Sequence, residues 1–390
     1  MDMPRKKPAL SDGQRALVKR MLAGDNAREL IATHLDTARY VDPDRDAAER
    51  RAFFERFPTA LVPSSLLQPG QAIRHRLTGK DLIITRDPDG QVHVLGNSCS
   101  HRATTLLHET GVQDARKLVC PYHAWVYNLG GDLIGLPRPK TFPGLCKEDQ
   151  GLVRYPAKDV GGMIFHIGDP MAPADFTGID MLEADFIGAG IGASRIYRSA
   201  QHEVASNWKM LVDNFCESYH VKRLHAGSIG GFFADGVTVS DRTGPHQRFV
   251  VGRTDHQGDI DAKDWPTIRK AMTLTYQIFP ATVVIVSPHY TSVMTIFPGD
   301  DVGHCRVEDF MLVPDDADPT LEPKWERSWN LLHGTTFAIE DFGAAAKCQA
   351  GVEAGYRETI LLGALEQRVQ TFHDECDRRL AEAGNPVQAS

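Results

Sequence analysis

The chain changes its hydrophobic pattern twice along its length. Residues 11–57 mix Leu, Ala and Phe with many charged residues and contain few β-branched runs, a pattern that predicts helices. Ser11 stands where an N-cap would begin the first helix, and the pair Phe57 and Pro58 predicts where the last one ends. We therefore expect residues 1–60 to form an N-terminal helical arm, whose simplest role is packing or contact between subunits.

From residue 61 the pattern becomes that of short strands. Apolar residues alternate or run together in QAIRHRLTG, DLIITRD, HVLGNS, LVCPYH, WVYNLGGDLIGLP and GMIFHIGD. The sequence DPDG at 87–90 is a hairpin signal, and Gly130 and Gly131 supply the backbone freedom that a second tight turn needs. These features predict a small all-β domain over residues 61–170.

The remaining residues, 171–390, combine both patterns. We expect a helix over about 207–220, then a loop-rich stretch, and two helical stretches near 321–346 and 354–383. Between them, the runs LTYQIF, TVVIVSPH, SVMTIF and CRVEDFMLV predict strands. The predicted fold class is therefore α+β, with the all-β domain followed by a larger α+β domain.

Length and composition narrow the classes of protein that need be considered. A chain of 390 residues with 42% hydrophobic residues is long enough for two domains with sizeable cores. The net charge of −8 argues against nucleic acid or an acidic membrane surface as the partner. No apolar run approaches the roughly 18 residues of a membrane span, so we expect no membrane association.

Two further features bear on the cellular compartment. The start of the chain, MDMPRKKPAL, is basic but is not followed by an apolar stretch, so no signal peptide is expected. The seven cysteines are scattered and odd in number, which does not suit a disulfide framework. Cysteines of this kind are typical of a reducing compartment, and we expect the protein to be cytoplasmic.

The strongest chemical signal is a pair of short stretches, 99-CSH-101 and 120-CPYH-123. Cys99 and His101 stand in the first and Cys120 and His123 in the second, with 18 residues between the two stretches. Two thiolates on one iron and two imidazoles on the other hold a Rieske [2Fe–2S] cluster. Zinc also binds two cysteines and two histidines, but zinc modules usually group the cysteines together. The spacing favours the cluster and leaves zinc as the alternative.

A second set of candidate ligands lies downstream. The segment 207-NWKMLVDNFCESYHVKRLH-225 offers His220 and His225, and Glu340 and Asp341 follow much later. Two histidines and one carboxylate form the facial triad that holds non-heme Fe(II) and leaves positions open for O₂ and substrate. By itself this signal is weak, because histidines five residues apart lie about 140° apart on an ideal helix. The helix would have to end or distort near His220.

The two sets of residues resemble one family. Residues 81–168, with N-x-C-x-H-R and C-x-Y-H-x-W, are similar to the Rieske domain of the terminal oxygenase (alpha) component of Rieske non-heme iron oxygenases, the aromatic-ring-hydroxylating oxygenases. Ala103 departs from the glycine that many members have there. Residues 207–225 are similar to the family's N-W-K…[ED]-N…[DE]-x-Y-H-x₄-H. The resemblance covers roughly residues 60–350.

The resemblance assigns roles to the candidate residues. It implies that His220, His225 and Asp341 bind the mononuclear iron, with Glu340 as the nearest rival of Asp341. It implies that Glu217 bridges the two metal sites, between an iron-bound histidine and a Rieske histidine of a neighbouring subunit. Asn214 would lie in the outer shell of the site. From the residues alone, Glu217 could equally belong to a solvated acidic stripe with Asp213 and His220 on one helix.

The family also implies a fold, a reaction and a set of partners. The expected catalytic domain has an antiparallel sheet wrapped by helices, a helix-grip or START-like fold. The expected function is a terminal oxygenase that takes electrons from a separate reductase, directly or through a ferredoxin, and uses O₂ to hydroxylate an apolar molecule, with an aromatic one favoured. The expected assembly is a homotrimer with electron transfer between subunits, with or without a small β subunit.

Two alternatives stay open. Within the family, the chain could catalyse oxidative N- or O-dealkylation, for example of a quaternary ammonium compound, which an aromatic cage would support. From another class, it could be a Rieske electron carrier or redox sensor whose second domain only binds a ligand. About 220 residues beyond the first domain, with a possible His/His/Asp set, argue against that second alternative.

Overall fold

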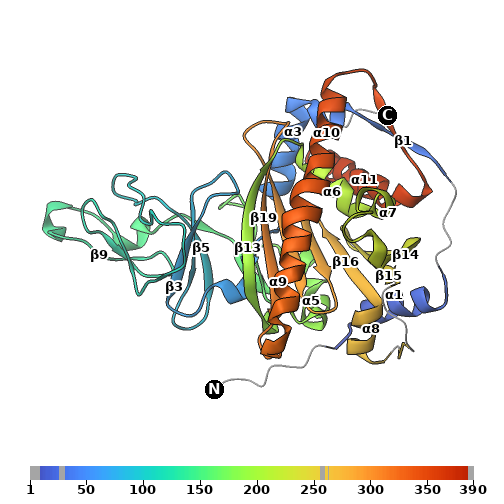
Figure 1. Ribbon diagram of the computed structural model, residues 1–390. Coiled ribbons are helices and arrows are strands. Elements are labelled where there is room, and N and C mark those ends of the chain that lie inside the picture. The colour runs from blue at the N-terminus through green and yellow to red at the C-terminus, as the bar shows by residue number, and fades with distance from the viewer. Residues whose placement is uncertain (1–8, 26–30, 255–259, 262, 385–390) are drawn as a thin grey trace.

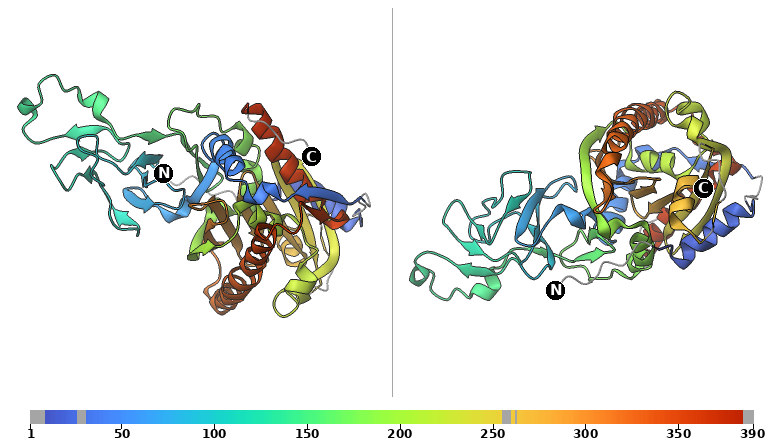
Figure 2. Two further views of the ribbon diagram at one scale, coloured as in Figure 1. Left: turned by 90° about the horizontal axis from the view of Figure 1, so that it is seen from above. Right: turned by 60° about the horizontal axis from the view of Figure 1, so that its bottom comes forward.

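The computed structural model describes residues 9–25, 31–254, 260–261 and 263–384. Residues 1–8 and 26–30 of the predicted arm, including the basic start of the chain, lie outside the described residues. Two parts form an elongated molecule, in which a slender all-β part projects from a larger part built on a curved sheet (Figures 1 and 2). The predicted α+β class is confirmed.

The all-β part contains three small antiparallel sheets. A five-stranded sheet has the order β10-β5-β4-β3-β6, and two three-stranded sheets have the orders β7-β8-β9 and β11-β12-β2. The turns predicted at DPDG and at Gly130 and Gly131 join β4 to β5 and β8 to β9, with φ of 85° at Gly90 and 90° at Gly131. The strands are β2 (Thr59–Pro63), β3 (Gln71–His75), β4 (Leu82–Arg86), β5 (Val92–Gly96), β6 (Gln113–Asp114), β7 (Leu118–Val119), β8 (Val126–Tyr127), β9 (Leu133–Gly135), β10 (Arg154–Tyr155), β11 (Ala157–Val160) and β12 (Met163–His166).

The larger part is built on one seven-stranded antiparallel sheet of order β13-β19-β18-β17-β16-β15-β14. Every neighbouring pair is antiparallel, and the central strands are buried along their whole length. These strands are β13 (Ser194–Val204), β14 (Phe233–Thr243), β15 (His246–Arg253), β16 (Met272–Ile278), β17 (Thr282–Val286), β18 (Thr291–Pro298) and β19 (Cys305–Pro314).

Alternation along β16 shows how the sheet separates a core from a cavity. Leu274, Tyr276 and Ile278 point to one face and pack in the core that joins the two parts of the molecule. Thr273 and Thr275 point to the other face and line a cavity. Because successive side chains of a strand point to opposite faces, a single sequence supplies both surfaces.

Helices cover the cavity face of the sheet. Helix α6 lies against strands β16, β17 and β18, inside the curve of the sheet (Figure 2). The long helix formed by α9, η8 and α10 crosses in front of it (Figure 1). The helices are α1 (Asp12–Leu22), α2 (Ala38–Val41), α3 (Pro43–Glu49), α4 (Thr177–Asp180), α5 (Glu183–Ala189), α6 (Trp208–Cys216), α7 (Val221–Leu224), α8 (Trp265–Ala271), α9 (Glu322–Leu331), α10 (Phe342–Glu353) and α11 (Gln367–Glu382), with π-helical turns at η1 (Arg50–Phe54) and η8 (Leu332–Asp341).

Three details differ from the sequence predictions. Strand β1 (Thr33–Asp36) pairs with β20 (Thr359–Leu362), although both segments were expected to be helical. Strands β14 and β15 occupy the stretch expected to be loop-rich. The helix expected over 207–220 ends at Cys216, because Glu217 is extended, with φ of −135° and ψ of 175°. The predicted stripe of Asp213, Glu217 and His220 on one helix is therefore wrong.

A buried ion pair fixes α6 to the N-terminal part of the chain. The ammonium of Lys209 contacts the carboxylate of Glu49, and neither side chain is exposed to solvent. Arg45 Nε donates a second hydrogen bond of 2.9 Å to Glu49. Removing one partner of a buried pair leaves the other charge desolvated.

We expect the substitution Lys209→Met to lower the free energy of unfolding by about 3 kcal/mol, because Glu49 would stay buried with less compensation. Urea denaturation followed by circular dichroism measures this change. Lys347→Met is the matched control, because Lys347 is exposed on α10. Equal stability of the two variants would contradict the structural role of the pair.

No helix in the described part of the chain has both the length and the apolar character needed to cross a bilayer.

Candidate metal centres

The first candidate centre lies at the tip of the all-β part, on two loops of similar shape. The loop after β5 carries Cys99 and the loop after β7 carries Cys120. In each loop the cysteine carbonyl accepts a hydrogen bond from an alanine four residues later, at 2.9 Å from Ala103 and 3.0 Å from Ala124. Both alanines have positive φ, 56° and 54°. This conformation favours glycine, which explains why glycine suits position 103 equally well.

The four candidate ligands are arranged as a cluster requires. Cys99 and Cys120 are each 2% exposed, whereas His101 and His123 are partly exposed. The Nδ1 atoms of the two histidines lie 3.1 Å apart. Burial and the neighbouring Cys120 both raise the pKa of the Cys99 thiol, and the two thiols form no disulfide. Buried thiols on one side and imidazoles toward the surface fit a [2Fe–2S] group held between the loops.

A residue that the sequence did not single out contacts this centre. The hydroxyl of Tyr127 on β8 lies 3.1 Å from Cys99 Sγ and accepts a hydrogen bond of 3.2 Å from the Ser100 N–H. Burial, and next the contact with Cys99, raises the pKa of Tyr127 to about 12. The hydroxyl therefore stays protonated and can donate to a thiolate at Cys99.

We expect Tyr127→Phe to lower the reduction potential of a cluster bound here by about 20–60 mV, the equivalent of one hydrogen bond to sulfur. A redox titration followed by EPR measures the potential. Tyr155→Phe serves as the control, because Tyr155 lies on β10 outside the two loops. An unchanged potential in Tyr127→Phe would show that the hydroxyl does not donate to the cluster.

The second candidate centre lies where α7 meets η8. His220 begins α7 and His225 ends it, so the distortion that their spacing required is supplied by a break between α6 and α7. The Nε2 atoms of His220 and His225 lie 3.6 Å and 3.2 Å from Asp341 Oδ1. One nitrogen or oxygen from each residue lies within 4.8 Å of the others, which is close enough for all three to contact one ion.

A carboxylate orients each histidine from behind. Glu217 contacts Nδ1 of His220 and also accepts a hydrogen bond from the His220 N–H, at 3.2 Å. Glu340 lies 2.6 Å from Nδ1 of His225 and accepts a second hydrogen bond of 2.6 Å from Ser228 Oγ. Each Nδ1 is thus engaged, which leaves each Nε2 to face Asp341. The role of Glu340 was missed because nothing in two adjacent acidic residues shows which faces inward.

The electrostatics of this centre fit a cation. Asp341 is 2% exposed, and its Oδ1 has no hydrogen-bond partner within the described structure. Burial lowers the pKa of His225, but the carboxylates of Asp341 and Glu340 outweigh burial and raise it. A buried, uncompensated carboxylate oxygen beside imidazoles is stabilised by positive charge, and a divalent metal would supply that charge.

Asn214 supports the centre through the backbone. Its Nδ2 donates a hydrogen bond of 3.0 Å to the main-chain carbonyl of Asp341. This contact ties α6 to η8 at the residue whose side chain faces the two histidines. The structure therefore places Asn214 as a positioning residue for the backbone of Asp341.

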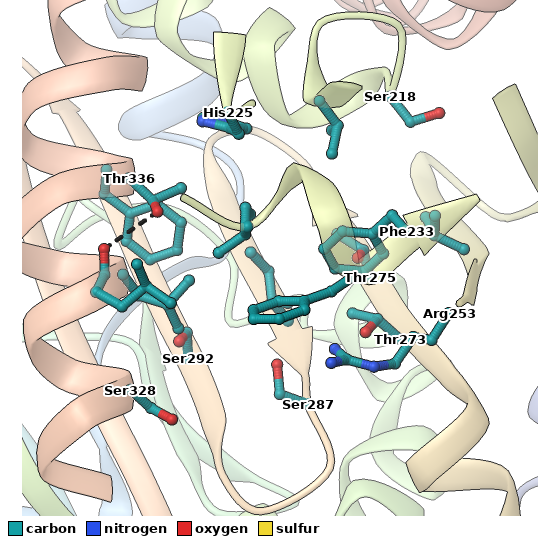
Figure 3. A pocket seen from close by; sticks show the side chains of 18 of the residues that line it. Ser218, His225, Phe233, Arg253, Thr273, Thr275, Ser287, Ser292, Ser328 and Thr336 are labelled. Carbon is teal, nitrogen blue, oxygen red and sulfur yellow. Dashed lines mark hydrogen bonds between the residues drawn. The ribbon is translucent and has the colours of Figure 1, made fainter. Parts of the chain in front are cut away.

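A cavity of about 650 Å³ opens from this centre. His225 lies at one end, and Ser287, Ser328 and Arg253 lie toward the other (Figure 3). The walls come from α6, the sheet and α9, and the apolar ones include Phe215, Val221, Ile229, Phe232, Phe233, Phe249, Val251, Ile285, Leu331, Leu332 and Phe337. Apolar walls around a few polar groups are typical of a site for a small organic molecule.

Two family models match the chain. The Rieske [2Fe–2S] domain matches residues 58–155, and the catalytic domain of the ring hydroxylating alpha subunit matches residues 193–382. The carnitine monooxygenase oxygenase subunit of Acinetobacter baumannii is 25% identical over 79% of this chain and 82% of its own length. The alpha subunit of biphenyl 2,3-dioxygenase from Rhodococcus jostii is 30% identical, over 43% of this chain and 38% of its own length.

Solved structures share the fold. Naphthalene 1,2-dioxygenase from Rhodococcus sp. bound to indole superposes with a TM-score of 0.78 at 17% identity and covers 96% of this chain and 99% of its own. A quaternary ammonium Rieske monooxygenase in complex with L-carnitine superposes with a TM-score of 0.74 at 20% identity, covering 93% and 97%.

Proposed function

Because the chain belongs to the ring-hydroxylating Rieske oxygenases as an alpha subunit, we propose that it oxygenates a small organic molecule in the cavity beside His220, His225 and Asp341. The observation that carries this proposal is the placement of those three residues. They converge at the closed end of an apolar cavity and approach from one side only. An ion held there keeps positions that face the cavity.

The residues of this chain would divide the work. We assign the [2Fe–2S] cluster to Cys99, His101, Cys120 and His123. When bound, the cluster would supply single electrons and the mononuclear iron would supply the site at which O₂ meets the substrate.

Around the mononuclear site, the protein supplies orientation and a dry pocket. Glu217 and Glu340 hold the Nδ1 atoms of His220 and His225 and so keep both Nε2 atoms deprotonated and directed inward. Phe215 and Phe337 bring their rings within 5.8 Å of each other beside the centre and exclude water from it. The substrate is oriented by the shape of the walls.

For the reaction, we propose hydroxylation of a molecule with an apolar body, an aromatic one being favoured by the Phe-rich walls. Oxidative N- or O-dealkylation is the second candidate, because a carnitine monooxygenase is among the similar proteins. An electron carrier without oxygenase activity would have no use for a closed His/His/Asp set at the end of a cavity.

For the partners, we propose a reductase, acting directly or through a ferredoxin, and a homotrimer in which Glu217 lies between the metal centres of neighbouring subunits. One similar structure, a quaternary ammonium Rieske monooxygenase, is described as revealing inter-subunit electron transfer. A small β subunit would be an addition to this trimer. The seven unpaired cysteines support a cytoplasmic location.

Iron analysis with EPR tests the proposed function. We expect about three irons per chain, a Rieske signal after reduction with dithionite, and a further signal when nitric oxide binds ferrous iron. Two irons without the nitric oxide signal, even after addition of Fe(II), would indicate an electron carrier instead. Zinc without a cluster signal would contradict both assignments.

A further inference from the structure

The charges that line the cavity are unevenly distributed. Its acidic side chains, Glu217 and Asp341, both lie at the metal centre. Its cationic side chains away from the histidine pair are Arg253, Lys324 and Arg327, and His289 is a further basic group. The end of the cavity away from the metal centre therefore carries positive charge and no carboxylate among the described lining residues.

Two of the cations stand at the mouth without an acidic partner. Lys324 and Arg327 lie on α9 and are exposed. Within the described ranges, no carboxylate lies within ion-pair distance of either side chain; the nearby Glu326 pairs with Arg198 instead, at 2.6 Å. A negatively charged group entering the mouth would meet charges that the described protein does not neutralise.

The third cation occupies the aromatic surface that a ligand cation would need. The guanidinium of Arg253 lies over the rings of Phe232 and Phe233, 5.5 Å and 5.3 Å from their centroids. Both rings line the cavity. A quaternary ammonium group is recognised by ring faces of this kind, but here it would sit beside a fixed positive charge.

The basic residues act together at the same end. The pKa of His289 is lowered by burial and by the positive charges of Lys324, Arg269, Lys270 and Arg253. The order of the helix also separates this end from the metal. Arg327 precedes Asp341 by 14 residues of continuous helix, on the order of 20 Å at about 1.5 Å per residue.

We infer that the substrate carries an anionic group, a carboxylate by preference, that binds between Arg253 and the Lys324 and Arg327 mouth while its apolar body reaches the metal centre. This inference rests on the proposed function, because it takes the cavity as the substrate site. It fixes the end of the substrate away from the metal, and both hydroxylation and dealkylation can occur at the other end.

Matched probes test the inference without turnover. Benzoate, phenylbutyrate and phenyldecanoate are compared with their neutral amides and with trimethylammonium compounds of the same lengths. Titration calorimetry with the iron-loaded protein measures each Kd. We expect a carboxylate to bind about tenfold more tightly than its amide, and the trimethylammonium compound to bind most weakly. The preference for the carboxylate should shrink as salt increases, because two of the cations are exposed.

Variants locate the binding end. The double substitution Lys324→Ala and Arg327→Ala should bring the carboxylate to within about twofold of the amide and leave the amide affinity unchanged, which also reports that the fold is intact. Arg253→Gln should reduce the same preference. Lys347→Ala is the control, since Lys347 is exposed on α10 and is not among the residues that line the cavity.

Three results would overturn the inference: a trimethylammonium compound that binds as tightly as its carboxylate, variants that keep the full preference for the carboxylate, or no binding by any carboxylate. Failure of the proposed function gives a different result. In that case the carboxylates bind with the expected preference, yet the reduced protein with its metals in place consumes no O₂ with any bound probe.

Discussion

Replacing Asp341 by alanine is expected to remove iron from the mononuclear centre and to lower O₂-dependent turnover by more than about a hundredfold. Loss of an outer carboxylate alone typically costs 10–100-fold in metal affinity or activity, and loss of a ligand should cost more. Asp341 supplies the oxygen that faces both Nε2 atoms, so no other described carboxylate replaces it. Iron analysis should fall from about three to about two per chain, with the Rieske signal unchanged.

The adjacent carboxylate supplies a matched comparison. Glu340→Ala removes the partner of His225 Nδ1 and leaves Asp341 in place. We expect it to weaken iron binding by about 10–100-fold, so that added Fe(II) restores the centre. Asp341→Ala should not be restored in this way. If the two variants exchange these results, Glu340 is the ligand, and if Asp341→Ala keeps full turnover, the oxygenase assignment is wrong.

Replacing Glu217 by glutamine is expected to slow electron transfer between the two centres by about 10–100-fold while both metals stay bound. The amide keeps the shape of the side chain and can still accept from His220, but it lacks the charge that would join a neighbouring subunit's Rieske histidine. Stopped-flow absorbance of the reduced cluster, mixed with O₂ and substrate, measures its reoxidation. Iron content should remain about three per chain.

Asp235→Asn is the control for Glu217→Gln. Asp235 is a nearby exposed carboxylate that pairs with Arg223 at 2.7 Å and contacts neither histidine. Its substitution removes the same charge and should leave the rate of cluster reoxidation unchanged. A normal rate in Glu217→Gln would show that the bridging role is wrong, and an equal slowing in both variants would indicate a general effect of surface charge.

Short-range chemistry could be predicted from the sequence, because it depends on spacing within loops. Cys99 and His101 are two residues apart and must lie close together in any fold. The strands of the central sheet were predicted for a related reason, since runs such as TVVIVSPH are apolar enough to be buried on both faces.

What could not be predicted depends on distant partners. Strand β1 is four residues long and exists because β20 pairs with it across more than 300 residues. Strand β14 contains DGVTVSDRT, whose polar residues suit a loop until β15 pairs with it. The end of α6 was also invisible, because the carboxylate of Glu217 accepts N–H groups that would otherwise continue the helix.

The π-helical turns of η8 have a consequence for how the chain tolerates insertions and deletions. In an α-helix, one added residue rotates everything after it by about 100°. Wider turns can take up an added residue without that rotation, so Leu332–Asp341 acts as a reserve of length between the mouth of the cavity and the iron ligand. Related chains that differ by a residue here could therefore keep both ends in place and change only the pitch of the helix between them.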